Sequence, residues 1–109
     1  MKSISLFTYS APDIKVSIEA YFDGDKLIID GYDIGKRVEE YWGDSDYEYV
    51  LTIPPAGVDF LFGYFNLAGK NKEDLLNSLA VKFNTNTCYS DIQKLLSDNG
   101  ITYESFSWR

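Results

Sequence analysis

The chain has 109 residues, of which 45% are hydrophobic and 25% are charged, a composition typical of one globular domain and not of a disordered segment. Its formal net charge is −7. That acidity disfavours binding to nucleic acids and to anionic membrane surfaces, because both require a basic face on the protein. A basic protein partner would be attracted, although acidity that serves solubility alone is an equally good interpretation.

The sequence gives no sign of an oxidising compartment or of a membrane. Cys88 is the only cysteine, so no internal disulfide bond can form. Residues 1–7 are too short and too alternating to serve as the apolar part of a secretory signal, and no apolar run approaches the roughly 20 residues of a membrane span. We therefore expect a cytoplasmic protein.

Alternating apolar and polar residues predict three strands in the first third of the chain. The clearest alternation runs from Ile14 to Phe22, and Asp23-Gly24-Asp25 then supplies residues that a tight hairpin turn requires. The strands are expected over residues 4–8, 14–22 and 26–30, with a turn at 9–13.

A loop and a short helix are expected next. The segment from Gly31 to Gly35 contains two glycines and reads as the loop. Asp33 would cap a helix over residues 36–42, and Gly43 would end that helix.

A fourth strand is expected over residues 46–53, with one apolar face and one acidic face. A period of two places Tyr47, Tyr49, Leu51 and Ile53 on the first face, and Asp46, Glu48, Val50 and Thr52 on the second. We expect the tyrosines to point inward and the carboxylates outward.

Helical spacing dominates the second half of the chain. Pro55 is expected to open a helix that runs towards Gly69, and Asn71 is expected to cap the next one. A last helix would begin near Thr87 or Ser90 and end at Asp98-Asn99-Gly100. Residues 101–108 would form a closing strand.

These elements predict one α+β domain that covers residues 1–109. We expect a mainly antiparallel sheet of about five strands with three to four helices packed on one face, in the order β-β-β-(α)-β-α-α-α-β.

No motif for catalysis or for a cofactor is complete. The chain has no histidine, which removes the usual general base and the commonest metal ligand, and Cys88 is expected to be a buried structural residue. Asp23-Gly24-Asp25 with Asp30 or Asp33 is a weak candidate for a divalent ion, but hairpin-turn chemistry explains these residues more simply. We expect no catalytic residue, no cofactor and no metal.

The acid-rich segment around residue 46 begins like an EF-hand calcium loop. Asp44, Asp46 and Glu48 alternate as in the opening of such a loop. The loop also requires glycine at its sixth position and glutamate at its twelfth, where this chain has Tyr49 and Pro55. The pattern therefore does not indicate a calcium site.

The same segment is a candidate interaction surface, because aromatic residues surround its carboxylates and such residues are typical interface anchors. The expected partner-binding residues are Trp42, Asp44, Asp46, Tyr47 and Glu48. In the alternative interpretation, the aromatic residues belong to the core and the carboxylates form a solvated face.

Three segments resemble a family of small, acidic, uncharacterised bacterial proteins. They are residues 18–35, residues 43–49 with the sequence GDSDYEY, and residues 99–107 near the end of the chain. The resemblance implies no activity and assigns no functional residue. In size and charge the chain is also similar to immunity proteins that neutralise bacterial toxins.

We therefore expect a non-enzymatic protein-binding module, of the immunity or inhibitor type, that neutralises a basic toxin or another basic partner. Two alternatives stay open. One is a small enzyme or ligand-binding domain with an acidic site around Asp46 and Glu48, and the other is a self-associating structural subunit.

Overall fold

The computed structural model describes residues 3–42 and 46–108. Within these residues the chain forms a five-stranded sheet in the order β1-β2-β3-β4-β5, in which every neighbouring pair is antiparallel. The elements are β1 (Ser3–Ala11), β2 (Ile14–Asp23), β3 (Lys26–Ile34), α1 (Lys36–Trp42), β4 (Asp46–Ile53), α2 (Pro55–Tyr64), α3 (Lys72–Lys82), α4 (Cys88–Asp98) and β5 (Glu104–Trp108). The expected α+β class and element order are confirmed.

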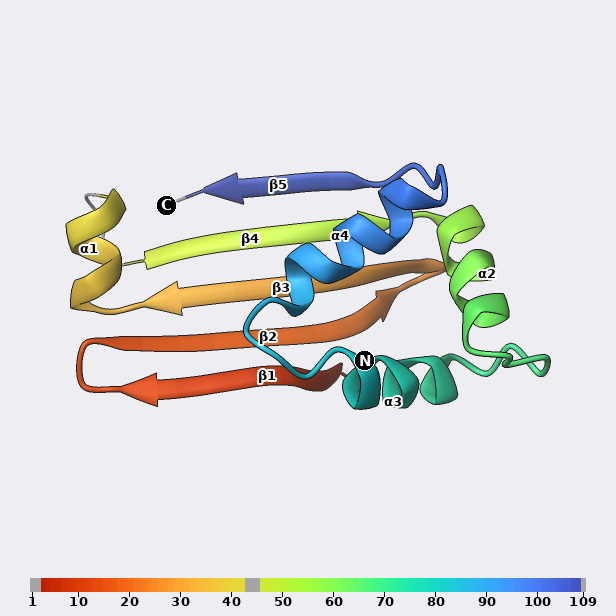
Figure 1. The fold of residues 1–109 in the computed structure, drawn as a ribbon, viewed down its shortest axis with the longest axis horizontal. Helices are drawn as coiled ribbons and strands as arrows, with labels where there is room; N and C mark the ends of the chain where they lie inside the picture. Colours follow the sequence, from red (N-terminus) through yellow and green to blue (C-terminus); the bar gives the residue numbers. More distant parts are fainter. Residues whose placement is uncertain (1–2, 43–45, 109) are drawn as a thin grey trace.

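Helices α2, α3 and α4 cover one face of the sheet, which we call the helix-side face; the opposite face is the open face. In Figure 1 these helices lie over the right-hand half of the sheet, while α1 lies at its left-hand end. The core forms where the buried side chains of the strands meet those of the helices. It includes Ile18, Ala20, Leu27, Ile29, Leu51, Ile53, Leu61, Leu75, Leu79, Ile92 and Leu96.

The helix boundaries follow local chemistry. Pro54 and Pro55 stop β4 and start α2, because proline cannot donate a ladder hydrogen bond but suits the first turn of a helix. Asn71 caps α3 as expected, since its side-chain oxygen accepts a 3.0 Å hydrogen bond from the backbone N–H of Asp74.

The third strand is longer than expected, because β3 continues through the segment predicted to be a loop. Asp33 therefore lies inside β3, and the prediction that it caps α1 is wrong. The bend comes at Gly35, whose backbone φ of +132° is rarely adopted by other residues. A side chain at Gly35 would also collide with the backbone of Asp13.

The first and last strands also differ from the expected bounds. Strand β1 extends to Ala11, with a bulge between Ser5 and Phe7, so the expected turn shrinks to the two residues after β1. Strand β5 begins only at Glu104, because the chain is still closing α4 at Ile101. The backbone N–H of Ile101 donates a 2.9 Å hydrogen bond to the carbonyl oxygen of Leu96.

The buried hydrophobic side chains of α2, α3 and α4 pack in the core. Among the described residues, no helix combines the length and the apolar character required to cross a membrane.

Candidate binding surfaces

Strand β4 distributes the expected partner-binding residues over two faces of the sheet. The antiparallel register places Asp46 and Glu48 on the open face and Tyr47 on the helix-side face, as their alternation predicts. Trp42 is the last residue of α1, but its side chain lies outside the described part of the structure, as does all of Asp44. The structure therefore does not gather these residues on a single surface.

On the open face, carboxylates from three adjacent strands lie side by side. Glu19 of β2 lies directly opposite Asp30 of β3, and Glu48 of β4 is a diagonal neighbour of Asp30. When the Asp30 carboxyl is protonated, it donates a hydrogen bond to the carboxylate of Glu48. We call this group, together with Asp46 and Tyr32, the acidic face.

Asp30 is the electrostatic centre of the acidic face. Its pKa is raised from 3.8 to about 6, first by burial and then by the charge of Glu48, by the hydrogen bond to Glu48 and by the charge of Glu19. One carboxylate oxygen of Asp30 is buried and accepts no hydrogen bond within the described residues. The fold therefore holds these carboxylates together against their mutual repulsion.

Two tyrosines flank this group on the open face. Tyr32 lies opposite Glu48 and is 39% exposed, and burial followed by the charge of Asp46 raises the pKa of its hydroxyl. Burial and the charge of Asp30 raise the pKa of Tyr21 in the same direction. Among the described side chains, no lysine or arginine forms an ion pair with the carboxylates of this face.

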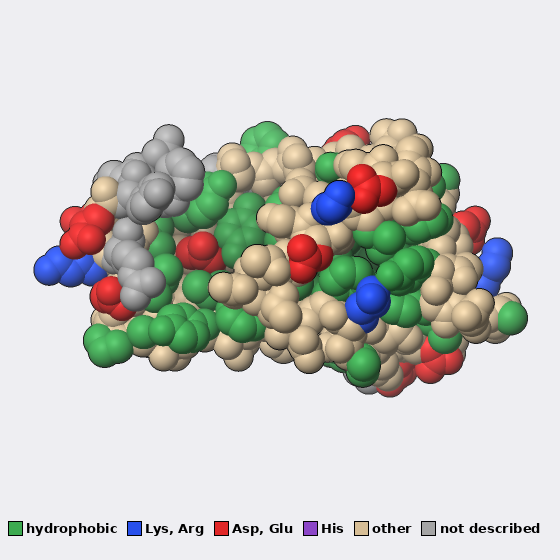
Figure 2. Space-filling view, viewed as in Figure 1, with side chains coloured by type: hydrophobic (Ala, Val, Ile, Leu, Met, Phe, Trp, Pro, Cys, Tyr) green, Lys and Arg blue, Asp and Glu red, His purple; other side chains and the backbone are tan. Residues whose placement is uncertain are grey.

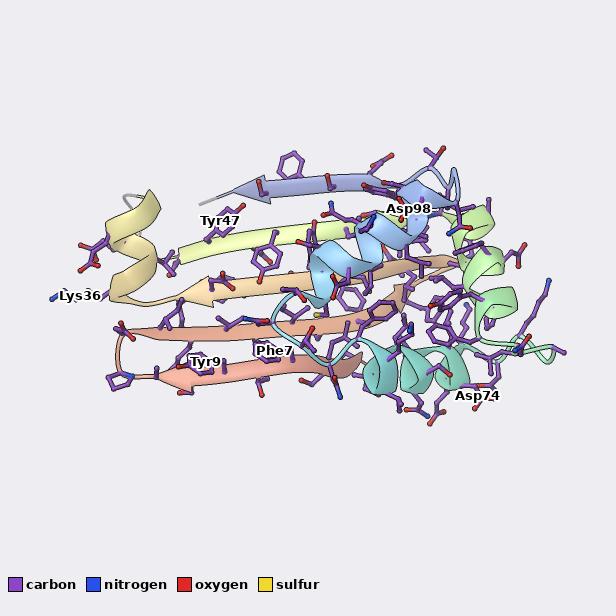
Figure 3. The ribbon with its side chains drawn as sticks, in the orientation of Figure 1. Phe7, Tyr9, Lys36, Tyr47, Asp74 and Asp98 are labelled. Atoms are coloured by element: carbon purple, nitrogen blue, oxygen red, sulfur yellow. The ribbon has the colours of Figure 1, made fainter. Side chains whose placement is uncertain are left out.

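A second surface lies on the helix-side face, where α2, α3 and α4 leave the sheet uncovered. Directly opposite residues form a row across four strands, from Tyr9 through Val16 and Asp33 to Tyr47. Figure 3 shows the labelled Tyr9 and Tyr47 on this uncovered half. Hydrophobic side chains gather there, with an acidic side chain among them (Figure 2). We call this row, together with Tyr49, the tyrosine hollow.

The side chain of Asp33 is half-buried in the middle of the tyrosine hollow, between Val16 and Tyr47. The hydroxyl group of Tyr49 donates a 2.8 Å hydrogen bond to the Asp33 carboxylate. The Tyr49 ring lies over Gly31, its cross-strand partner, at a position where any side chain would overlap the ring. Burial raises the pKa of Asp33, and the hydrogen bond from Tyr49 lowers it again in part.

Two depressions lie along the tyrosine hollow, one lined by residues at its Tyr9 end and the other by residues at its Tyr47 end. One has a volume of about 400 Å³ and is lined by Phe7, Tyr9, Ile14, Val16 and Asn86. The other has a volume of about 220 Å³ and is lined by Tyr47, Tyr49, Tyr89, Gln93, Ser105, Phe106 and Ser107. In the second depression the Tyr49 and Tyr89 rings meet edge to face, with centroids 4.9 Å apart.

Asp46 also lines a depression, at the end of the sheet. Its volume is about 320 Å³, and the lining includes Ala11, Ile14 and Lys15. Lys15 therefore contributes a positive charge to the surface around Asp46. The hydroxyl group of Tyr32 donates a hydrogen bond to the carboxylate of Asp46, so this depression borders the acidic face.

Cys88 is fully buried at the start of α4, as predicted. Burial raises the pKa of its thiol to about 11, so the thiol is protonated at neutral pH. The described residues contain no group of three or more histidine, cysteine, aspartate or glutamate side chains placed to hold a metal ion.

Sequence reasoning missed Glu19, Asp30 and Asp33 as members of these surfaces. The hairpin turn at Asp23-Gly24-Asp25 fixes the register that places Glu19 opposite Asp30. The pairing of Glu19 with Asp30 could therefore have been predicted from the turn residues. For Asp33 the sequence offered no comparable signal, because the apolar–polar alternation of β3 is lost after Ile29.

Comparison with known proteins finds no match: no protein-family model, no curated protein and no solved structure shows significant similarity to the chain.

Proposed function

We propose that the chain is a non-enzymatic protein-binding module of the immunity or inhibitor type, and that its acidic face binds a basic protein partner. The observation that carries the proposal is the position of Asp30 between Glu19 and Glu48 on adjacent strands. Like charges held this close destabilise the free protein, and a partner that brings lysine or arginine side chains would relieve their repulsion.

The shape and the composition of the open face support the same function. Ser17 and Tyr32 are exposed on it, so a partner can reach both hydrogen-bonding groups and an aromatic ring beside the carboxylates. Exposed tyrosine supplies large contact area at a small cost in side-chain entropy. The net charge of −7 would also steer a basic partner towards the protein and speed its association.

The first experiment measures binding between the purified chain and the purified product of the adjacent gene, by isothermal titration calorimetry at two salt concentrations. The proposal expects a complex whose affinity falls as salt rises, because the charges that drive association are screened. The absence of a complex at both salt concentrations contradicts the proposal for that partner. A complex with no dependence on salt contradicts the electrostatic mechanism.

A further inference from the structure

The tyrosine hollow lies on the face of the sheet opposite the acidic face, so it is a separate site. Its carboxylate, Asp33, is half-buried between Val16 on one strand and Tyr47 on the next. The only side-chain hydrogen bond described for this carboxylate comes from the neutral hydroxyl of Tyr49. A carboxylate can accept about four hydrogen bonds, so lone pairs remain for a ligand.

Charge complementarity indicates what such a ligand carries. Among the described side chains, no lysine or arginine forms an ion pair with Asp33. A charge that is partly removed from water without a counter-charge is costly, and a cation from outside the chain would offset that cost. The hydrogen bond from Tyr49 fixes the carboxylate in place, so a ligand meets an oriented acceptor.

The aromatic side chains around Asp33 narrow the choice of cation. Tyr9 lies at one end of the row, and its side chain is 48% exposed. At the other end, the ring centroids of Tyr47 and Tyr49 are 5.5 Å apart. A planar guanidinium group can stack on such rings and donate two parallel hydrogen bonds to a carboxylate. An ammonium group is a compact point charge that is more strongly hydrated, and it lacks the planar fork.

We propose that the tyrosine hollow binds the guanidinium group of an arginine side chain that a protein partner inserts against Asp33. Val16, the cross-strand neighbour of Asp33, lines a depression of about 400 Å³, a volume within the range of cavities that hold small ligands. Phe7 and Val16 line it and would pack against the aliphatic part of the arginine side chain.

The test uses three short peptides that differ at one position: acetyl-Gly-Arg-Gly-amide, the same peptide with lysine, and the same peptide with the neutral arginine analogue citrulline. Each is titrated into the full chain, labelled with ¹⁵N, and followed by amide chemical shifts. The proposal expects saturable shifts at Gly31 and Asp33 with the arginine peptide, and an affinity at least several-fold weaker for both lysine and citrulline.

Two substitutions locate the binding. Asp33→Asn keeps the shape of the side chain, removes its charge and should weaken the arginine peptide about tenfold. The matched control, Asp59→Asn, removes a charge from an exposed residue of α2 and should leave the shifts at Gly31 and Asp33 unchanged. If Asp33→Asn does not fold, Tyr9→Ala at the exposed end of the row tests the same site, with an expected few-fold loss.

Several results would overturn the proposal. They are shifts that do not saturate, equal affinity for the arginine and citrulline peptides, and an arginine affinity that survives both Asp33→Asn and Tyr9→Ala. Shifts confined to residues of the acidic face would overturn it as well, while supporting the proposed function. The two proposals can therefore fail independently.

Discussion

The hydroxyl group of Tyr49 donates a 2.8 Å hydrogen bond to the carboxylate of Asp33 on the neighbouring strand. Tyr49 can reach this carboxylate because its ring lies over Gly31, where no side chain intervenes. The contact joins the end of the tyrosine hollow to the edge of the core, since Tyr49 also packs against the core cluster. The tyrosine hollow and the acidic face lie on opposite faces of the sheet, and both include residues of β3 and β4.

Removal of the hydroxyl in Tyr49→Phe should lower the free energy of unfolding by about 1–2 kcal/mol, because a hydrogen bond to a charged group is lost in a partly buried site. The pKa of Asp33 should rise, since the hydrogen bond that stabilises its charged form is absent. Urea unfolding and a carboxyl NMR titration measure the two effects. An unchanged Asp33 pKa would contradict the contact.

The substitution Gly31→Ala should destabilise the chain by about 1–3 kcal/mol, because the added methyl group overlaps the ring of Tyr49. Gly63→Ala in α2 is the matched control, since a methyl group there meets no atom within 4 Å. The control should stabilise the protein by up to about 1 kcal/mol, as alanine favours helix over glycine. Equal effects of the two substitutions in urea unfolding would argue against the packing of Tyr49 over Gly31.

Asp30 should make the stability fall as the pH rises through its titration range. Its pKa is about 6 in the folded chain and 3.8 in the absence of structure, so the folded state binds the proton more tightly. The stabilisation is therefore present below about pH 4 and is lost by about pH 6. Solvent screening of this partly exposed group limits the effect to about 1 kcal/mol.

Asp30→Asn removes this titration and keeps a hydrogen-bond donor for Glu48. The difference in free energy of unfolding between Asp30→Asn and the unsubstituted chain should grow in favour of the variant between pH 4 and pH 7. Asp59→Asn, at an exposed ion pair with Lys70, should show a difference within about 0.5 kcal/mol. If the Asp30→Asn difference were flat with pH, the raised pKa would be wrong.

Two helix starts offer a contrast in capping. Asn71→Ala should cost about 1 kcal/mol, since the Asn71 side chain accepts a hydrogen bond from the backbone at the start of α3. Thr87→Ala at the start of α4 should cost less than about 0.5 kcal/mol, because its side chain makes no capping bond and its hydroxyl bonds to the exposed side chains of Thr85 and Asp91. Thermal unfolding of both variants ranks them, and a larger loss for Thr87→Ala would contradict the capping assignment.

The parts of the fold that depend on local sequence patterns could be predicted. The alternation from Ile14 to Phe22 and the turn at Asp23-Gly24-Asp25 determined the hairpin of β2 and β3, and Asn71 determined the start of α3. The prediction was wrong where glycine was taken as a sign of a loop. Gly31 lies within β3 because a tyrosine on the next strand covers it, and that contact depends on tertiary structure.

The candidate surfaces depended on strand order, which the sequence leaves open. The alternation along β4 correctly separated Asp46 and Glu48 from Tyr47. It carried no information about which carboxylates of other strands join them, so Glu19 and Asp30 were missed. Their meeting with Glu48 requires β2, β3 and β4 to be neighbours in that order.

Charge reversal on the acidic face distinguishes binding of a basic partner at this face from a general effect of net charge. The double variant Asp46→Lys with Glu48→Lys is titrated by calorimetry against the basic partner, beside a control, Asp59→Lys with Asp98→Lys, that makes the same change in net charge on exposed helical residues. The first variant should weaken binding at least 100-fold, about 2.7 kcal/mol, while the control should change it only a few-fold. Equal losses in the two variants, or an unchanged affinity in the first, would contradict binding at the acidic face.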